Sequence, residues 1–188
     1  GEGGFSLAGA GAILTDRHQV QAFWNSLLLG TLVGVAGTAL GFLFAFTVAR
    51  ARLPPAFVAV LDAAILLPLV SPPFTTAIAM IFSFGARGLI TYELLGIKGF
   101  TVYGLGSTLF SETLTYFPIA YLTLKPMLAA IDSNVEGMGA SLGGSRWYVF
   151  RTVTLPLATP GIANAFLLLF AASLADFATP LILAGNSF

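Results

Sequence analysis

A stretch from Phe23 to Ala49 without a single charged residue constrains this chain most. It is long enough to cross a bilayer as a tilted helix, because about 20 apolar residues span the hydrocarbon core. The whole sequence resembles this stretch: 57% of its 188 residues are hydrophobic, only 9% are charged, and the mean hydropathy is +0.92. Soluble domains carry about 25% charged residues. The sequence therefore predicts an all-α polytopic membrane protein.

Three further apolar segments, at 56–84, 105–124 and 160–184, predict four spans in total. Lys and Arg are enriched in the short cytoplasmic loops of membrane proteins, so their distribution predicts sidedness. The four spans place five cations on one side and three on the other: Arg50, Arg52, Lys125, Arg146 and Arg151, against Arg17, Arg87 and Lys98. This bias predicts that the chain starts and ends outside, with the polar segment 132–156 in the cytoplasm.

The chain lacks the residues that several functional classes need. The chain has no cysteine for a disulfide, a thiolate metal site or a nucleophile, and His18 is its one histidine. The formal net charge is zero, which gives no basis for nucleic-acid binding. We expect no metal, no cofactor and no enzymatic activity. Residues 1–20 are expected to form a surface lead-in, and the start at Gly1 without Met suggests a piece of a longer protein.

Small residues recur every three or four positions along the first span, on one face of the expected helix. In lipid, such a face lets a second helix approach closely, because packing replaces the missing hydrophobic drive. The alternative is that these glycines line a substrate path, and we favour packing. The residues are Ala22, Ser26, Gly30, Gly34, Gly37, Gly41 and Ala45.

Prolines interrupt the second span at Pro68 and at Pro72-Pro73. Proline lacks a backbone donor and clashes with the preceding turn, so the helix should kink or break. Irregular backbone at membrane depth is tolerated where it is buried in protein or lines a cavity. Residues 68–76 are therefore candidates for the wall of a translocation path, with a plain packing kink as the equal alternative.

Acidic residues occur inside the third and fourth spans, at Glu112 and Asp176. A carboxylate facing lipid there costs about 3 kcal/mol, so both should face the bundle interior or a wet cavity. Pro180 removes a donor to the carbonyl of Asp176 and should loosen that helix. With Tyr116, these residues are candidates for the translocation path. Structural roles also explain the same residues: an ion pair with a loop cation such as Arg87, or a helix cap.

The polar segment between the third and fourth spans predicts two short helices joined by a turn. Ser133 and Glu136 have the spacing of a capping box that starts the first helix. Gly143 is expected to end it with a positive φ, and Ser145 to cap the second helix. Pro156 is expected to close that helix, and Thr159-Pro160 to begin the next span.

Residues 142–157 resemble the EAA loop of importer-type ABC permeases, where the ATPase subunit docks. Gly143, Val153, Leu155 and Pro156 match its spacing, whereas Gly137-Met138-Gly139 replaces the Glu-Ala-Ala triplet and Glu136 stands one residue early. The resemblance implies a MetI-like permease domain over 1–188, with a cytoplasmic coupling helix pair at 132–156 and truncated after the fourth span. The implied ATPase-coupling residues are Ser133, Glu136, Gly137, Ala140, Gly143, Ser145 and Arg146.

Two further stretches, 67–74 and 176–181, are similar to the first half of fused ferric-iron permeases. This resemblance implies transport of ferric iron across a bacterial inner membrane. It implies cytoplasmic ATP-binding subunits, an external substrate-binding protein and a second permease half as partners. The sequence agrees in one respect: it contains no Gly-x-x-x-x-Gly-Lys-[Ser/Thr] motif, so ATP hydrolysis must come from a partner.

Other functions remain open at the level of sequence. Glu112 and Asp176 would also suit an ion-coupled secondary transporter. Permeases for thiamine, polyamines or phosphonates resemble this chain closely as well. A membrane scaffold or enzyme anchor is the third alternative, although neither it nor a secondary carrier needs a capped cytoplasmic helix pair.

Overall fold

The computed structural model describes residues 17–51, 53–131, 137–139, 141 and 143–184, and these contain helices but no strand. The expectation of an all-α chain is thereby confirmed. The elements follow one another along the chain in this order: α2 (Arg17–Arg50), α3 (Pro55–Val70), α4 (Pro73–Phe84), η1 (Leu89–Leu94), α5 (Leu105–Ala130), α7 (Arg146–Val149), η2 (Phe150–Thr154), α8 (Leu155–Ala175) and α9 (Ala178–Leu183).

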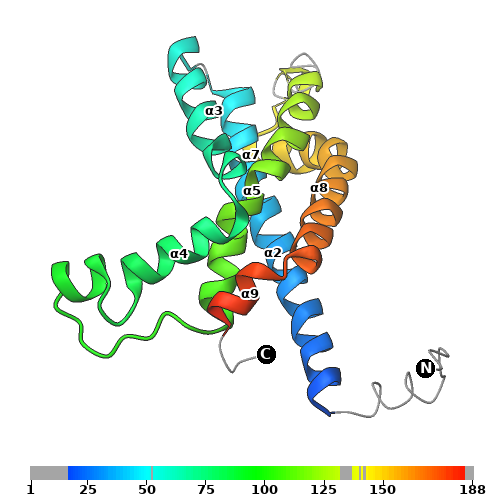
Figure 1. Cartoon of the computed structure of the whole chain (residues 1–188). Helices are drawn as coiled ribbons and strands as arrows, with labels where there is room; N and C mark the ends of the chain where they lie inside the picture. The colour runs from blue at the N-terminus through cyan, green and yellow to red at the C-terminus, as the bar shows by residue number, and fades with distance from the viewer. Residues whose placement is uncertain (1–16, 52, 132–136, 140, 142, 185–188) are drawn as a thin grey trace.

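Helices α2, α5 and α8 pack together as the core of the molecule (Figure 1). Tyr121, Leu124 and Leu128 of α5 are almost completely buried there, against Ala165 and Leu169 of α8. The start of α2 and α9 lie at one end of this bundle, and α7 lies at the other (Figure 1). The bundle therefore carries the polar segment at one end and the α8–α9 junction at the opposite end.

The small face of α2 is a packing face, as its spacing predicted. A Cβ added at Gly34 would lie 2.7 Å from the ring of Phe166 on α8, and one at Gly41 would lie 2.6 Å from Ala120 on α5. Real side chains do not make contacts this close, so both neighbouring helices approach α2 as near as glycine permits. The close approach supplies van der Waals contact where the bilayer supplies no hydrophobic drive.

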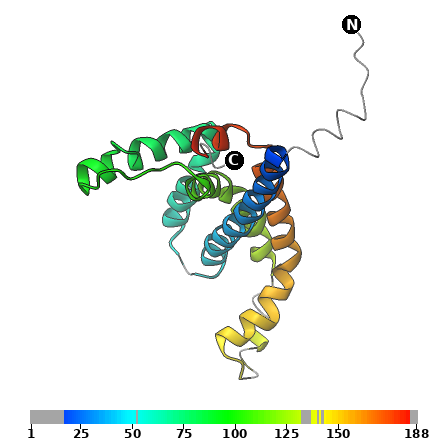
Figure 2. The same ribbon diagram turned by 90° about the horizontal axis from the view of Figure 1, so that it is seen from below.

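The expected second span, 56–84, is two helices. Ser71 and Pro72 are both extended, with ψ of 146° and 142°, because a residue before proline is pushed out of the helical region. The predicted break thus occurs at Pro72, whereas Pro68 lies inside the last turn of α3. Beyond the break α4 leaves the bundle sideways, as Figures 1 and 2 both show.

The third span does not end at Lys125-Pro126 as expected, because α5 continues to Ala130. Proline removes one hydrogen bond, but tertiary contacts beyond it hold the last turn. Leu128 is fully buried, and its carbonyl accepts from Nη1 of Arg50 at 3.0 Å. Packing against α2 therefore overrides the local stop signal.

The predicted boundaries around the fourth span were also wrong. Pro156 does not close a helix and Thr159-Pro160 does not open one, because helix runs from Arg146 through η2 into α8. The wide turn of η2 bonds the N–H of Leu155 to the carbonyl of Phe150, so Pro156 stands at the start of a new α-helical turn, where proline costs little. At the far end α8 stops at Ala175, and α9 follows after a break.

Three helical segments in the described part of the chain are long and apolar enough to cross a membrane: Gln19–Arg50, Phe74–Leu94 and Arg146–Ala175. The expected third span lies within α5, which carries Glu112, Lys125 and several threonines and is not among the three. The count of four spans therefore stays a prediction.

Candidate translocation site and coupling segment

Two side-chain hydrogen bonds connect α5 to the end of α8 like the rungs of a ladder. The hydroxyl of Tyr116 donates to Oδ2 of Asp176 at 2.9 Å, and the hydroxyl of Ser173 donates to Oε2 of Glu112. Glu112 and Tyr116 are one turn apart on α5, and Ser173 and Asp176 are separated by nearly one turn on the facing element. We call these four residues the carboxylate ladder. It brings together all three candidates that the sequence placed in the third and fourth spans.

Asp176 lies in the break between α8 and α9 and caps the shorter helix. Its Oδ1 accepts from the backbone N–H groups of Ala178 at 3.0 Å and Thr179 at 3.1 Å. The sequence left open a cap or an ion pair with Arg87, and the structure contains the cap. Among the described residues, neither Glu112 nor Asp176 has a cationic partner.

Glu112 is fully buried, yet its second carboxyl oxygen, Oε1, has no hydrogen-bond partner among the described residues. The hydroxyls of Ser111 and Thr179 are also buried without one. An unsatisfied buried polar group costs free energy, and buried carboxyls inside membrane proteins mark functional positions. The ladder therefore has open acceptor capacity in the protein interior.

A small cavity of about 350 Å³ lies beside the ladder. Ser173 and Asp176 both line it, so Ser173 connects the cavity to the buried carboxyl of Glu112. The N-terminal half of α2, the last turn of α8, and α9 with its two flanking residues complete the wall through Ser26, Leu29, Leu174, Phe177, Pro180, Leu181 and Ala184.

The proline candidates lie away from this cavity. Pro68 lies in the last turn of α3, and Pro72 directly precedes α4. This junction contacts α5 through Thr76 of α4, because the hydroxyl of Thr115 donates to that of Thr76 at 3.1 Å. Thr115 directly precedes Tyr116, so the junction is adjacent to the ladder along α5 without lining its cavity. Among the described residues, no three His, Cys, Asp or Glu side chains converge as a metal site would require.

The turn of the coupling segment has the predicted geometry. Gly143 has φ of +85°, and Oγ of Ser145 accepts from the N–H of Tyr148 at 3.2 Å, so Ser145 caps α7. Gly137 lies in helical backbone with open space around it, and Arg146 is exposed at the start of α7. Ser133, Glu136 and Ala140 lie outside the described residues.

Aromatic rings tie the coupling segment to the end of α2. The ring of Phe150 lies 5.3 Å from that of Phe46 and 5.4 Å from that of Trp147, measured between centroids. Val149 is buried on the same short helix, while Trp147 and Tyr148 stay largely exposed. The ring of Phe150, at the start of η2, therefore places the coupling segment in contact with the end of α2.

Sequence reasoning missed one cluster, in which Asp62 of α3 meets Lys125 and Tyr121 of α5. Nζ of Lys125 lies 2.5 Å and 2.7 Å from the two carboxyl oxygens of Asp62, and the hydroxyl of Tyr121 donates to the same carboxylate. The distribution of cations along the sequence uses Lys125 as a marker of sidedness alone. An acid in an otherwise apolar helix was the signal that pointed to such a partner.

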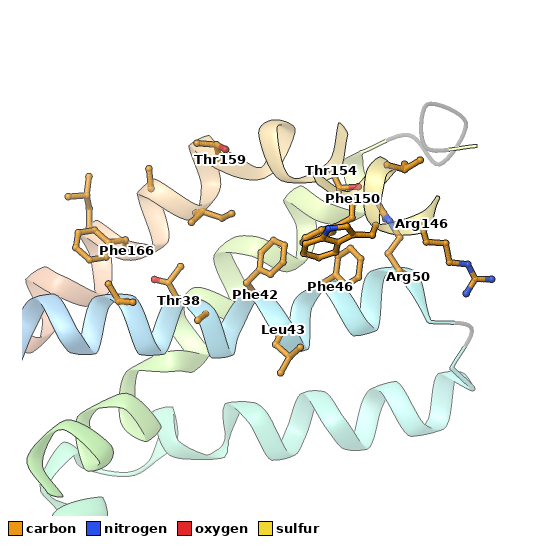
Figure 3. Close-up of a pocket in the computed structure, with 17 residues that line it drawn as sticks. Thr38, Phe42, Leu43, Phe46, Arg50, Arg146, Phe150, Thr154, Thr159 and Phe166 are labelled. Atoms are coloured by element: carbon orange, nitrogen blue, oxygen red, sulfur yellow. The ribbon is translucent and has the colours of Figure 1, made fainter. Parts of the chain in front are cut away.

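An apolar groove of about 1480 Å³ opens between α2, the α7–η2 segment and α8 (Figure 3). Arg50 and Arg146 lie at its end near α7, as Figure 3 shows. Phe42, Phe46 and Phe150 occupy the middle of the groove, and Phe166 lies toward the other end.

Comparison with known proteins shows which protein family the chain is similar to. Residues 37–188 match the model of the binding-protein-dependent transport system inner membrane component. The chain is 32% identical over 178 residues to the ferric transport system permease protein FbpB of Actinobacillus pleuropneumoniae, covering 93% of this chain and 26% of that protein. It is 33% identical over 175 residues to the molybdenum transport system permease protein ModB of Escherichia coli K12, covering 93% of this chain and 75% of ModB. The chain thus spans little more than a quarter of the ferric relatives that it matches.

Proposed function

Since the chain belongs to the family of binding-protein-dependent transport system inner membrane components, we propose that it forms part of the translocation path of an ABC importer. Its expected partners are cytoplasmic ATP-binding subunits, an external substrate-binding protein and a second permease half, in the bacterial inner membrane. The family is one of transport permeases rather than enzymes. This membership favours the importer over the secondary carrier and the scaffold that the sequence had left open.

The carboxylate ladder is the proposed part of the path. Four features support this assignment: a buried carboxyl with an open oxygen at Glu112, a second carboxylate at Asp176, an adjoining cavity and a break in the helix. Irregular backbone at membrane depth suits a cavity wall. Because Asp176 caps α9 and also binds Tyr116, a movement of α9 relative to α5 would open or close the cavity.

The proposed coupling site is the α7 end of the bundle. Gly143 and Ser145 shape the turn, and the contact of Phe150 with Phe46 transmits movement of that turn to α2. The α2 helix in turn packs on both α5 and α8 through its glycines. A push from an ATPase subunit on α7 therefore reaches the helices that carry the ladder.

Ferric iron is the substrate that the ladder supports best. Hard cations prefer oxygen ligands, and the ladder offers two carboxyls and two hydroxyls without a Lys or Arg partner among the described residues. A path for an oxyanion would be expected to carry positive charge instead. Molybdate is the second candidate, because the chain covers three quarters of ModB.

The decisive experiment measures transport by the full-length protein with its partners in proteoliposomes. Radiolabelled ferric iron and molybdate are supplied in parallel with the cognate binding protein, with and without ATP inside. We expect ATP-dependent uptake of iron and none of molybdate. Uptake of molybdate alone would exclude the ferric assignment, and ATP-independent uptake would exclude the importer mechanism.

A further inference from the structure

The apolar groove between α2, α7–η2 and α8 lies apart from the carboxylate ladder and has no role in the path proposed above. Its walls are made by aliphatic and aromatic side chains, with ring centroids of Phe42 and Phe46 5.8 Å apart and those of Phe46 and Phe150 5.3 Å apart. Val35, Leu43 and Leu167 on its rim are more than half exposed. An apolar surface of this size calls for an apolar occupant.

One end of the groove is closed by direct helix contact. At Gly34 the backbone of α2 lies so near to Phe166 that an added Cβ would approach the ring to 2.7 Å. Toward Arg50 the two helices diverge, and Phe150 and Trp147 line the space between them. The groove is therefore a wedge that is shut near the middle of α2 and widens toward α7 (Figure 3).

The length of the wedge indicates which kind of occupant fits it. Val35 and Arg50 are fifteen positions apart on α2, which corresponds to about 22 Å at 1.5 Å per residue. A bilayer with its headgroups is about 40–45 Å thick, so the wedge matches one leaflet from mid-plane to headgroup. A further transmembrane helix must cross the whole core of about 30 Å and would meet the closed end at Gly34.

The open end carries charge that complements a phosphate. Arg50 and Arg146 both line the groove there, and none of the described lining residues is acidic. One guanidinium nitrogen of Arg50 is held by the carbonyl of Leu128 at 3.0 Å, which fixes the side chain at this end. Guanidinium groups bind phosphate oxygens through paired N–H donors, and exposed Trp147 at the same end is a residue type of membrane interfaces.

We propose that the groove binds one anionic phospholipid from the leaflet on the coupling side. Its phosphate lies at the exposed Arg146, at the end of the groove where Arg50 adds positive charge, and one acyl chain runs along Phe42 and Phe46 toward Phe166. Basic pockets between membrane helices bind anionic headgroups in this way. Because the lipid contacts Phe150 and Trp147 as well as α2, it fills the space between the coupling segment and the bundle.

The test uses the full-length permease with its partner subunits, reconstituted in vesicles of equimolar phosphatidylglycerol and phosphatidylcholine. After extraction in mild detergent, native mass spectrometry counts the lipids that stay bound. We expect one phosphatidylglycerol per copy of this domain, retained in preference to phosphatidylcholine. Arg146→Gln should lower its retention about fivefold, since one cation near a lipid headgroup contributes on that scale. Ala39→Trp, at an exposed position on the groove wall, should abolish retention by filling the wedge.

Arg151→Gln is the matched control, because Arg151 is exposed on the neighbouring η2 turn and does not line the groove. It should retain the lipid at the wild-type level. Equal retention of the two lipids, equal losses in Arg146→Gln and Arg151→Gln, or full retention in a folded Ala39→Trp would each overturn the proposal. Cross-linking of Ala39→Cys to another segment of the full-length protein would overturn it too, by showing that protein covers the groove.

Discussion

Tyr116 donates a hydrogen bond to Asp176 across 2.9 Å and thereby fastens α5 to the break between α8 and α9. The same carboxylate caps α9 through its other oxygen. One side chain thus holds three elements together at the end of the bundle opposite the coupling segment. If this end opens during transport, the bond between Tyr116 and Asp176 must break or move with α9.

Asp176→Asn should impair transport by about tenfold or more while the permease still assembles with its ATPase. Asparagine keeps the carbonyl oxygen that caps α9 but removes the charge, and a hydrogen bond to a charged group contributes about 1.5–3 kcal/mol. Uptake by proteoliposomes and co-purification of the ATPase measure the two properties. Tyr116→Phe is the control, since it removes the hydrogen bond between Tyr116 and Asp176 and leaves the carboxylate of Asp176 in place. Wild-type uptake by Asp176→Asn would assign the residue a purely structural role.

Gly143→Val should uncouple ATP hydrolysis from transport. At φ of +85° a β-branched residue is strained by about 1–2 kcal/mol, so the turn before α7 must change shape. Gly106→Val provides the comparison, because Gly106 lies outside the coupling segment, has no positive φ, and its Cβ would meet nothing within 4 Å. The measurement is the ratio of ATP hydrolysed to substrate transported. An unchanged ratio in Gly143→Val would refute the role of this turn.

Gly41→Leu should destabilise the bundle by about 1–3 kcal/mol, the usual cost of overpacking. The new Cβ would lie 2.6 Å from the Cβ of Ala120 and 2.8 Å from the backbone nitrogen of Tyr121, so α2 and α5 must separate. Gly106→Leu adds the same side chain at an exposed position with nothing within 4 Å. Thermal unfolding in detergent, followed by fluorescence, compares the variants. Equal melting temperatures would show that the contact between α2 and α5 is not limiting.

Asp62 and Lys125 should show an interaction energy of about 0.5–3 kcal/mol in a double-mutant cycle, since the two groups are in direct contact. The single variants Asp62→Asn and Lys125→Met each leave one charge without its partner, whereas the double variant leaves none. The double variant should therefore be less destabilised than the sum of the two single variants. Strict additivity would mean that the pair adds nothing to the attachment of α3 to α5.

Local features of the chain were predictable because they depend on spacing within one segment. The small residues of α2 fall on one helical face wherever that helix lies, so Gly34 and Gly41 could be assigned to packing before any partner was known. Likewise, Gly143 specifies a turn through a positive φ that few other residues favour, and Ser145 specifies a cap through its side-chain oxygen. The resemblance to an EAA loop rests on the same short-range spacing.

Helix boundaries near proline were not predictable in this way. Pro126 and Pro160 each remove one donor, yet both lie inside helices. Beyond Pro126 the last turn of α5 is held by a residue distant in sequence, because Arg50 donates to the carbonyl of Leu128. At Pro72 the helix does end, because Ser71 and Pro72 each precede a proline and are extended, and α4 turns away from the bundle after this break (Figure 1). A single proline inside a helix is thus tolerated in α5 and α8, whereas the Pro72-Pro73 pair ends one.

The sequence by itself determined that this chain is helical, enters the membrane and carries a polar, capped segment, because composition and short spacings specify these properties. Only the tertiary structure decided which carboxyls meet which hydroxyls. The register of α5 on α8 sets whether Glu112 faces Ser173 and Tyr116 faces Asp176, and that register results from the packing of whole helix surfaces. Likewise, Asp62 meets Lys125 because α3 packs against α5, and no local pattern encodes that contact.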